Sequence, residues 1–203
     1  MIGSPVGKQV AAIGVCLSVC AGLMLDLAAH VAQWGFRAGL WSFVLYFTTL
    51  SNTLVAFVAG RAAVGRMPAA SFMGAVATYI AVVAVVYHLV LRNPQVSESL
   101  SSTLLHSVTP LAYWTFWSWF APRGKLAWIM ALRWIAFPLA YLAYVLARGF
   151  FEGRYPYGFL DVNALGYGSV FLRCLVIGAL TLTLGSCVVA LDRRLSARAA
   201  RSA

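Results

Sequence analysis

Long apolar stretches are the feature that most constrains how this chain can fold. About six stretches of roughly 20 mostly apolar residues follow one another, and a helix of about that length crosses the hydrocarbon core of a bilayer. Hydrophobic residues make up 62% of the chain and charged residues only 10%, a composition typical of integral membrane proteins. The short connections leave no room for a second domain, so we expect one all-α transmembrane bundle over residues 1–203. Its spans are predicted near residues 8–32, 41–60, 69–91, 100–120, 126–149 and 168–192.

The formal net charge of +10 is explained by the topology of a membrane protein and does not require a charged binding partner. Lys and Arg are enriched in the cytoplasmic loops of membrane proteins, and more of them fall on the side of the two termini than on the other side. We therefore expect both termini in the cytoplasm. As a separate expectation, the membrane is the cytoplasmic membrane of a bacterium. The basic residues are dispersed among loops, apart from a tail from Arg193 to Arg201 that suits anionic lipid headgroups. The expected partners are membrane lipids, and binding of nucleic acid is not expected. The sequence does not indicate the oligomeric state.

Polar side chains inside the predicted spans collect toward the outer leaflet. Thr49 and His106 each lie roughly two turns inside a span, where an unexplained polar group is costly. Helical spacing also places Thr49 and Asn52 on one face, and Asp26 and His30 on another. If these faces turn inward, they form a polar pocket that opens toward the outer leaflet and receives an amphiphile from the membrane.

Structural explanations exist for most of these residues. A Ser or Thr in a membrane helix commonly bonds its own backbone or joins two helices. Asp26 and Arg173 could neutralise one another as a buried pair. Residue types alone therefore leave the structural and functional interpretations open.

Three short segments, in this order along the chain, carry a resemblance to a known family. They are YFTTLSN at Tyr46–Asn52, LHSVTP at Leu105–Pro110 and GRYPYGFLD at Gly153–Asp161. In this combination the chain resembles the superfamily of the androgen-induced protein and the androgen-dependent TFPI-regulating protein. The resemblance implies a six-span membrane fold and a threonine-type hydrolase that acts on fatty acid esters of hydroxy fatty acids.

The resemblance also implies a site. The family's nucleophilic threonine corresponds to Thr49, or to Thr48 if the match shifts by one residue. The family's histidine corresponds to His106. A threonine hydroxyl needs a base within hydrogen-bond reach to attack an ester carbonyl, and a neutral His106 can act as that base. Asn52, Ser51 or Ser107 could donate to the oxyanion.

Arg173 is the candidate that could hold the free carboxylate of a lipid acid. The remaining residues predicted to bind substrate are Asp26, His30, His88 and Tyr144. No cofactor and no metal is expected under this hypothesis.

Three other hypotheses remain at this point. Three histidines, an aspartate and a serine at similar depth could bind zinc and its water in a metal-dependent membrane hydrolase. Asp26, Arg173 and His106 could form the polar site of a small transporter or lipid-binding bundle. His88 and His106 could be the axial ligands of a haem.

Overall fold

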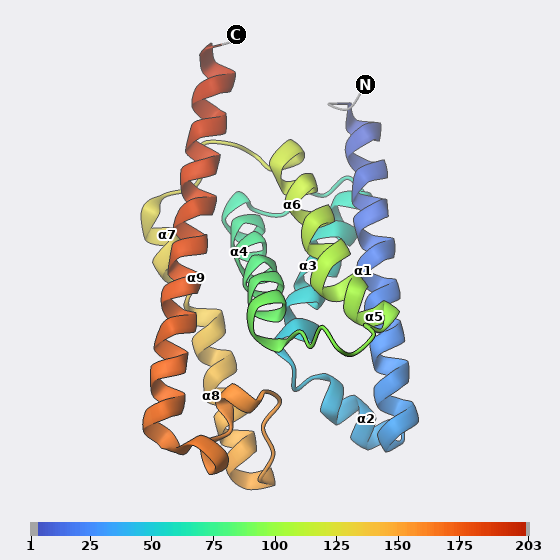
Figure 1. Ribbon diagram of the computed structural model, residues 1–203. Coiled ribbons are helices and arrows are strands. Elements are labelled where there is room, and N and C mark those ends of the chain that lie inside the picture. Colours follow the sequence, from blue (N-terminus) through green and yellow to red (C-terminus); the bar gives the residue numbers. More distant parts are fainter. Residues whose placement is uncertain (1–3, 202–203) are drawn as a thin grey trace.

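A computed structural model describes residues 4–201, so residues 1–3 and 202–203 of the predicted domain lie outside the described part. Within that part the chain forms an elongated bundle of helices, and its two ends lie at the same end of the bundle (Figure 1). Four helical segments are long and apolar enough to cross a membrane, or five if a bent pair is counted as one span. The predicted all-α membrane class is confirmed at this level.

Three of these segments agree well with the predicted spans. They are α1 (Pro5–Trp34), α4 (Ala70–Val86) together with the π-helical turn η1 (Tyr87–Leu91), and α9 (Val162–Arg201). Helix α9 contains one non-helical residue, Gly166, at φ 74° and ψ 157°. The fourth is formed by α7 (Trp128–Arg133) and α8 (Ala136–Glu152), which follow one another closely.

The second predicted span is broken in the structure. Residues 41–60 are divided between α2 (Phe36–Phe43) and α3 (Phe47–Ala63), which are bent by 82° relative to one another. The expected connection before this span is therefore largely helical, and the expected straight helix from residue 41 is wrong. The carbonyl groups near the break accept hydrogen bonds from α8: Tyr141 donates to Leu45, and Arg148 donates to Trp41. This satisfies backbone groups that an uninterrupted helix would have paired internally.

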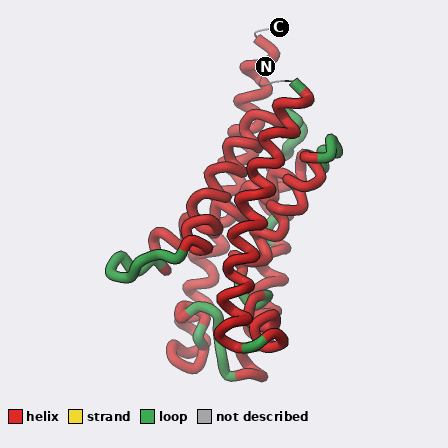
Figure 2. Tube along the Cα trace, turned by 90° about the vertical axis from the view of Figure 1, so that its right-hand side faces the viewer, coloured by secondary structure: helices red, strands yellow, loops and turns green. Residues whose placement is uncertain are grey.

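The fourth predicted span, residues 100–120, is divided into α5 (Leu100–Thr103), the π-helical turn η2 (Leu104–Val108) and α6 (Thr109–Phe120). The connection between η1 and α5 projects sideways from the bundle part-way along its length (Figure 2). The π-helical turns η1 and η2 thus flank the same connection. Such turns are frequently found at functional sites.

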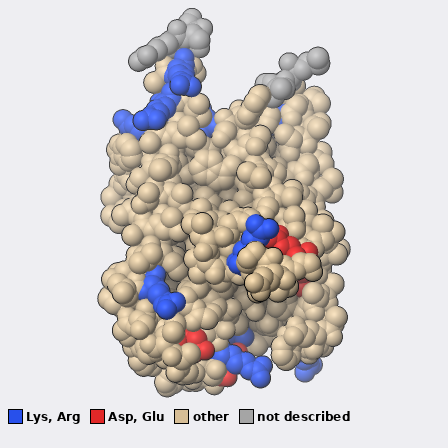
Figure 3. All heavy atoms as spheres, viewed as in Figure 1, with Lys and Arg blue, Asp and Glu red and all other residues tan. Residues whose placement is uncertain are grey.

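Helix α4 lies in the middle of the bundle and is buried over most of its length, from Met73 to Val83. It packs against α3, α6 and α9, and the largest buried side chains, Trp117, Tyr113 and Phe116, come from α6. The outer helices instead expose large apolar side chains, such as Leu17 and Phe171. Figure 3 shows that charged side chains are sparse over most of one face, with basic side chains near the C-terminal end of α9. Such a surface is stable against lipid and not against water.

Candidate functional site

A polar cavity of about 240 Å³ lies between α1, the start of α3, η1 and the α5–η2 segment. Tyr157, from the segment before α9, also reaches its wall. Its lining residues are Asp26, His30, Tyr46, Thr48, Thr49, Tyr87, Leu91, Ser99, Ser101, Ser102, Leu105, His106 and Tyr157.

Thr48 and His106 meet in this cavity. The Thr48 Oγ1 atom lies 3.2 Å from His106 Nε2. The other ring nitrogen, Nδ1, lies 3.0 Å from the backbone carbonyl oxygen of Ser102. A carbonyl oxygen can only accept, so Nδ1 carries the ring proton and Nε2 of the neutral ring has its lone pair free. The Thr48 hydroxyl therefore donates to His106, which is the arrangement of a hydroxyl and its general base.

The ring of His106 is held from two further directions. Tyr87 stacks on it, with ring centroids 3.9 Å apart and planes inclined by 16°. The Ser102 hydroxyl lies 3.3 Å from Nδ1 and donates to the Tyr87 hydroxyl over 2.9 Å. Tyr87 belongs to η1 and His106 to η2, so the two π-helical turns meet at the histidine.

Asn52 joins the helix that carries Thr48 to the helix that carries His106. Its amide nitrogen donates to the carbonyl of Thr48 over 2.9 Å and to the carbonyl of Leu105 over 3.2 Å. In η2 the N–H of Thr109 donates to Leu104, five residues back. The next donor in that pattern would be residue 110, but Pro110 has no N–H. The proline thus leaves the Leu105 carbonyl free for Asn52.

The start of α3 places Thr48 in the first helical turn, where backbone N–H groups have no helical acceptor. The N–H of Phe47 donates to the Tyr157 hydroxyl over 3.1 Å. Burial raises the pKa of the Tyr157 hydroxyl, so this group remains protonated and can itself donate. The cavity therefore holds a hydrogen-bond donor, the Tyr157 hydroxyl, as well as the base that contacts Thr48.

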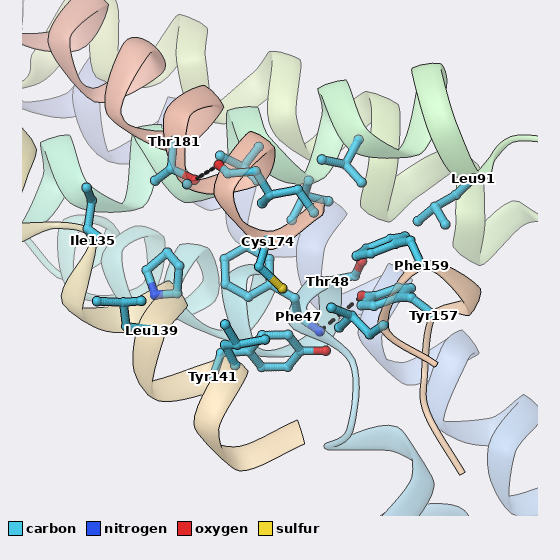
Figure 4. A pocket seen from close by; sticks show the side chains of 18 residues that line it. Phe47, Thr48, Leu91, Ile135, Leu139, Tyr141, Tyr157, Phe159, Cys174 and Thr181 are labelled. Carbon is cyan, nitrogen blue, oxygen red and sulfur yellow. Dashed lines mark hydrogen bonds between the residues drawn. The ribbon is translucent and has the colours of Figure 1, made fainter. Parts of the chain in front are cut away.

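A second, apolar cavity of about 100 Å³ adjoins the polar one. Both cavities are lined by Thr48, Leu91 and Tyr157. Figure 4 shows these side chains at one end of the apolar cavity, with Leu139 and Ile135 toward the other end. Thr48 therefore stands where a polar chamber and an apolar chamber meet.

The structure brings together part of the predicted site. Thr49, Asp26 and His30 line the polar cavity with His106. The residue that contacts His106 is Thr48 and not Thr49. Thr48 is the alternative that the resemblance gives when the match shifts by one residue. The Thr49 hydroxyl is buried without a hydrogen-bond partner among the described residues, and Asp26 lies 4.0 Å from His30.

Other predicted site residues lie away from both cavities. Asn52 bonds backbone groups, Ser51 is buried elsewhere in α3, and Ser107 lies 3.1 Å from the exposed His88. Tyr144 accepts a bond from Arg148 beside the α2–α3 break. Arg173 is exposed on α9 and forms no ion pair with Asp26.

Three site residues had no predicted role: Tyr87, Ser102 and Tyr157. The four-residue spacing of Ser102 and His106 predicts that they share one helical face, and the structure places the two side chains in contact. Tyr157 belongs to the GRYPYGFLD segment, but only the tertiary structure shows that it reaches α3.

The three histidines have different partners and do not converge on one point. His30 faces Asp26, His88 faces Ser107, and His106 faces Thr48. No group of three or more His, Cys, Asp or Glu side chains suited to a metal is found among residues 4–201. No family model, curated protein or solved structure matches this chain.

Proposed function

We propose that this protein is an intramembrane hydrolase of long-chain lipid esters, with Thr48 as nucleophile and His106 as general base. The observation that carries the proposal is the 3.2 Å contact between Thr48 Oγ1 and His106 Nε2, located where the polar and apolar cavities meet. The resemblance of the YFTTLSN and LHSVTP segments to the threonine-type hydrolases supports His106 as the base. It assigns the nucleophile to Thr49, or to Thr48 if the alignment shifts by one residue, and the contact with His106 favours Thr48.

The reaction follows from the hydrogen-bond directions. His106 Nε2 takes the hydroxyl proton as Thr48 Oγ1 attacks the ester carbonyl carbon. When the tetrahedral intermediate collapses, the carbon–oxygen bond to the alcohol breaks and His106 returns the proton to the leaving oxygen. Water, deprotonated by the same nitrogen, then attacks the carbonyl carbon of the acyl-threonine. The bond from that carbon to Thr48 Oγ1 breaks, His106 returns the proton to Oγ1, and the fatty acid leaves.

The negative charge on the intermediate requires donors in a site protected from water. The first-turn N–H groups of α3 and the Tyr157 hydroxyl are the nearest candidates, and the positive end of the helix dipole favours the same charge. Ser102 and Tyr87 keep the His106 ring in the tautomer that accepts at Nε2. No carboxylate contacts the ring, so the catalytic unit is a dyad.

We further propose six membrane crossings, with residues 100–120 as the fourth and the bent α2–α3 pair contributing the second. Both termini then lie in the cytoplasm, as the distribution of Lys and Arg predicts. The connection that carries Arg92 and Glu98 lies at the outer headgroup level, and the cavity opens beside it toward the outer leaflet.

The proposal is tested with purified protein in vesicles that contain a long-chain ester. Wild-type protein should release fatty acid, and His106→Gln should lose the activity by about 10²-fold or more, the usual contribution of a general base. His88→Gln is the matched control, because His88 lies outside both cavities and should retain activity. Absence of ester hydrolysis by the wild type, or equal rates for His106→Gln and wild type, would refute the proposal.

A further inference from the structure

The polar cavity has an unusual balance of charge and hydroxyl groups. Among the described residues no Lys or Arg lines it, and Asp26 is its one carboxylate. Both nitrogens of His106 are engaged in the bonds of a neutral ring. The nearby Arg92 forms an ion pair with Glu98 outside the wall. The rest of the polar wall consists of His30 and the hydroxyl-bearing side chains Tyr46, Thr48, Thr49, Tyr87, Ser99, Ser101, Ser102 and Tyr157.

Two buried polar atoms of wall residues have no hydrogen-bond partner among residues 4–201. Thr49 is 2% exposed, and its Oγ1 atom is buried without a hydrogen bond; His30 Nδ1 is buried in the same condition. Buried polar groups are costly unless they are paired. A ligand with several hydroxyl groups can both donate to and accept from such atoms.

The arrangement of the two cavities orients an ester. Thr48 lines both, so an ester carbonyl placed at Thr48 directs its acyl chain into the apolar cavity. The alcohol part then occupies the polar cavity, beside Asp26, His30 and Thr49. The chemistry of that cavity therefore selects the alcohol.

We infer that the alcohol part of the substrate is an uncharged polyol, as in a monoacylglycerol, and that the cavity rejects an ester whose alcohol part carries a free carboxylate. This inference rests on the proposed function. A carboxylate in the polar cavity would lie beside the carboxylate of Asp26 and would find no Lys or Arg among the lining residues. Arg173, the residue expected to bind such an acid, lies on the exposed face of α9.

The first test compares two substrates with the same acyl chain: monooleoylglycerol and the oleoyl ester of a hydroxy fatty acid. Wild-type protein should hydrolyse the glycerol ester at least about tenfold faster. Asp26→Asn should shift the ratio toward the acid-bearing ester by about tenfold, as expected when one like charge is removed. Asp161→Asn is the matched control: Asp161 lies outside both cavities, and Asn keeps its role at the start of α9, so the ratio should not change.

The second test does not depend on turnover. Two oleyl ethers, neither of which is an ester, compete with a fluorescent lipid for the protein in neutral detergent: oleyl glycerol ether, and the oleyl ether of glycolic acid, which carries a carboxylate in place of the polyol. The glycerol ether should displace the probe at about tenfold lower concentration than the acid-bearing ether, and Thr49→Val should weaken binding of the glycerol ether more. Thr49→Val also tests the role of the polar cavity if the Asp26→Asn protein does not fold.

The outcomes separate the two proposals. Tighter binding of the glycerol ether than of the acid-bearing ether, with no hydrolysis of any ester, would refute the hydrolase and leave the selection of a polyol standing. Hydrolysis with equal or faster turnover of the acid-bearing ester would refute the selection of a polyol and leave the hydrolase standing. Equal or tighter binding of the acid-bearing ether would likewise overturn the inference, whether or not an ester is hydrolysed.

Discussion

Replacement of Thr48 by valine removes one oxygen atom and keeps the shape of the side chain. The lost bond is the 3.2 Å contact with His106, and a hydrogen bond of this kind contributes about 0.5–1.5 kcal/mol to stability. His106 Nε2 still faces the cavity, where water can replace the hydroxyl, so the free energy of unfolding should fall by only about 1 kcal/mol. Ester hydrolysis should fall by about 10³-fold or more, because the nucleophile and the proton that His106 removes are both gone.

Thr49→Val is the matched control one residue further along α3. The Thr49 hydroxyl is buried and has no hydrogen-bond partner among the described residues, so its removal should be neutral or slightly stabilising. At most one hydrogen bond to the substrate is lost, which limits the decrease in hydrolysis to about tenfold. The two variants should thus differ in turnover by about 10²-fold or more and hardly in stability.

The assay combines fatty acid release with covalent labelling by a lipophilic fluorophosphonate, followed by mass spectrometry of the labelled peptide. Label should be found on Thr48 in the wild type and in Thr49→Val, and should be absent from Thr48→Val. An inactive Thr49→Val beside an active Thr48→Val would transfer the nucleophile to Thr49. Full activity and labelling in both variants would refute the dyad.

Three further substitutions test the packing around the site. Pro110→Ala restores an N–H in the first turn of α6, directly after η2. This should favour regular α-helix, rotate His106 away from Thr48 and lower turnover by about tenfold or more without loss of thermal stability. Arg123→Gln should destabilise the protein by about 3–5 kcal/mol in a denaturation assay, because it leaves the buried Asp192 carboxylate without its cation. Gly39→Ala places a Cβ atom 2.7 Å from the backbone of α1 and should cost about 1–3 kcal/mol of stability.

Each of these variants has a control of the same type. Pro122→Ala lies in an exposed connection after α6, Arg133→Gln removes an exposed cation, and Gly14→Ala adds a methyl group with nothing within 4 Å. The controls should change turnover and stability little. A Pro110→Ala protein with wild-type turnover would show that the π-helical turn does not position His106. An Arg123→Gln or Gly39→Ala protein as stable as its control would contradict the corresponding packing argument.

The apolar periodicity and length of the stretches were sufficient to predict the membrane class and the limits of α1 and α4. These features depend on local sequence, because a bilayer imposes the length and composition of each helix that crosses it. The gathering of Asp26 and His30 in one cavity with His106 also followed from helical spacing and depth. The break at residues 44–46 did not, since no Gly or Pro marks it and the side chains that stabilise it come from α8.

The sequence by itself determined that this chain belongs in a membrane and that a Thr-Thr pair and a histidine lie at similar depth inside it. Only the tertiary structure decided that Thr48, rather than Thr49, faces His106. Adjacent residues in a helix point about 100° apart, so the choice depends on how α3 is rotated against η2. Asn52 fixes that rotation by bonding carbonyl groups on both helices, one of them left free by Pro110. The exposed position of Arg173 was likewise decided by the packing of α9, because a helix buries only the face that its neighbours cover.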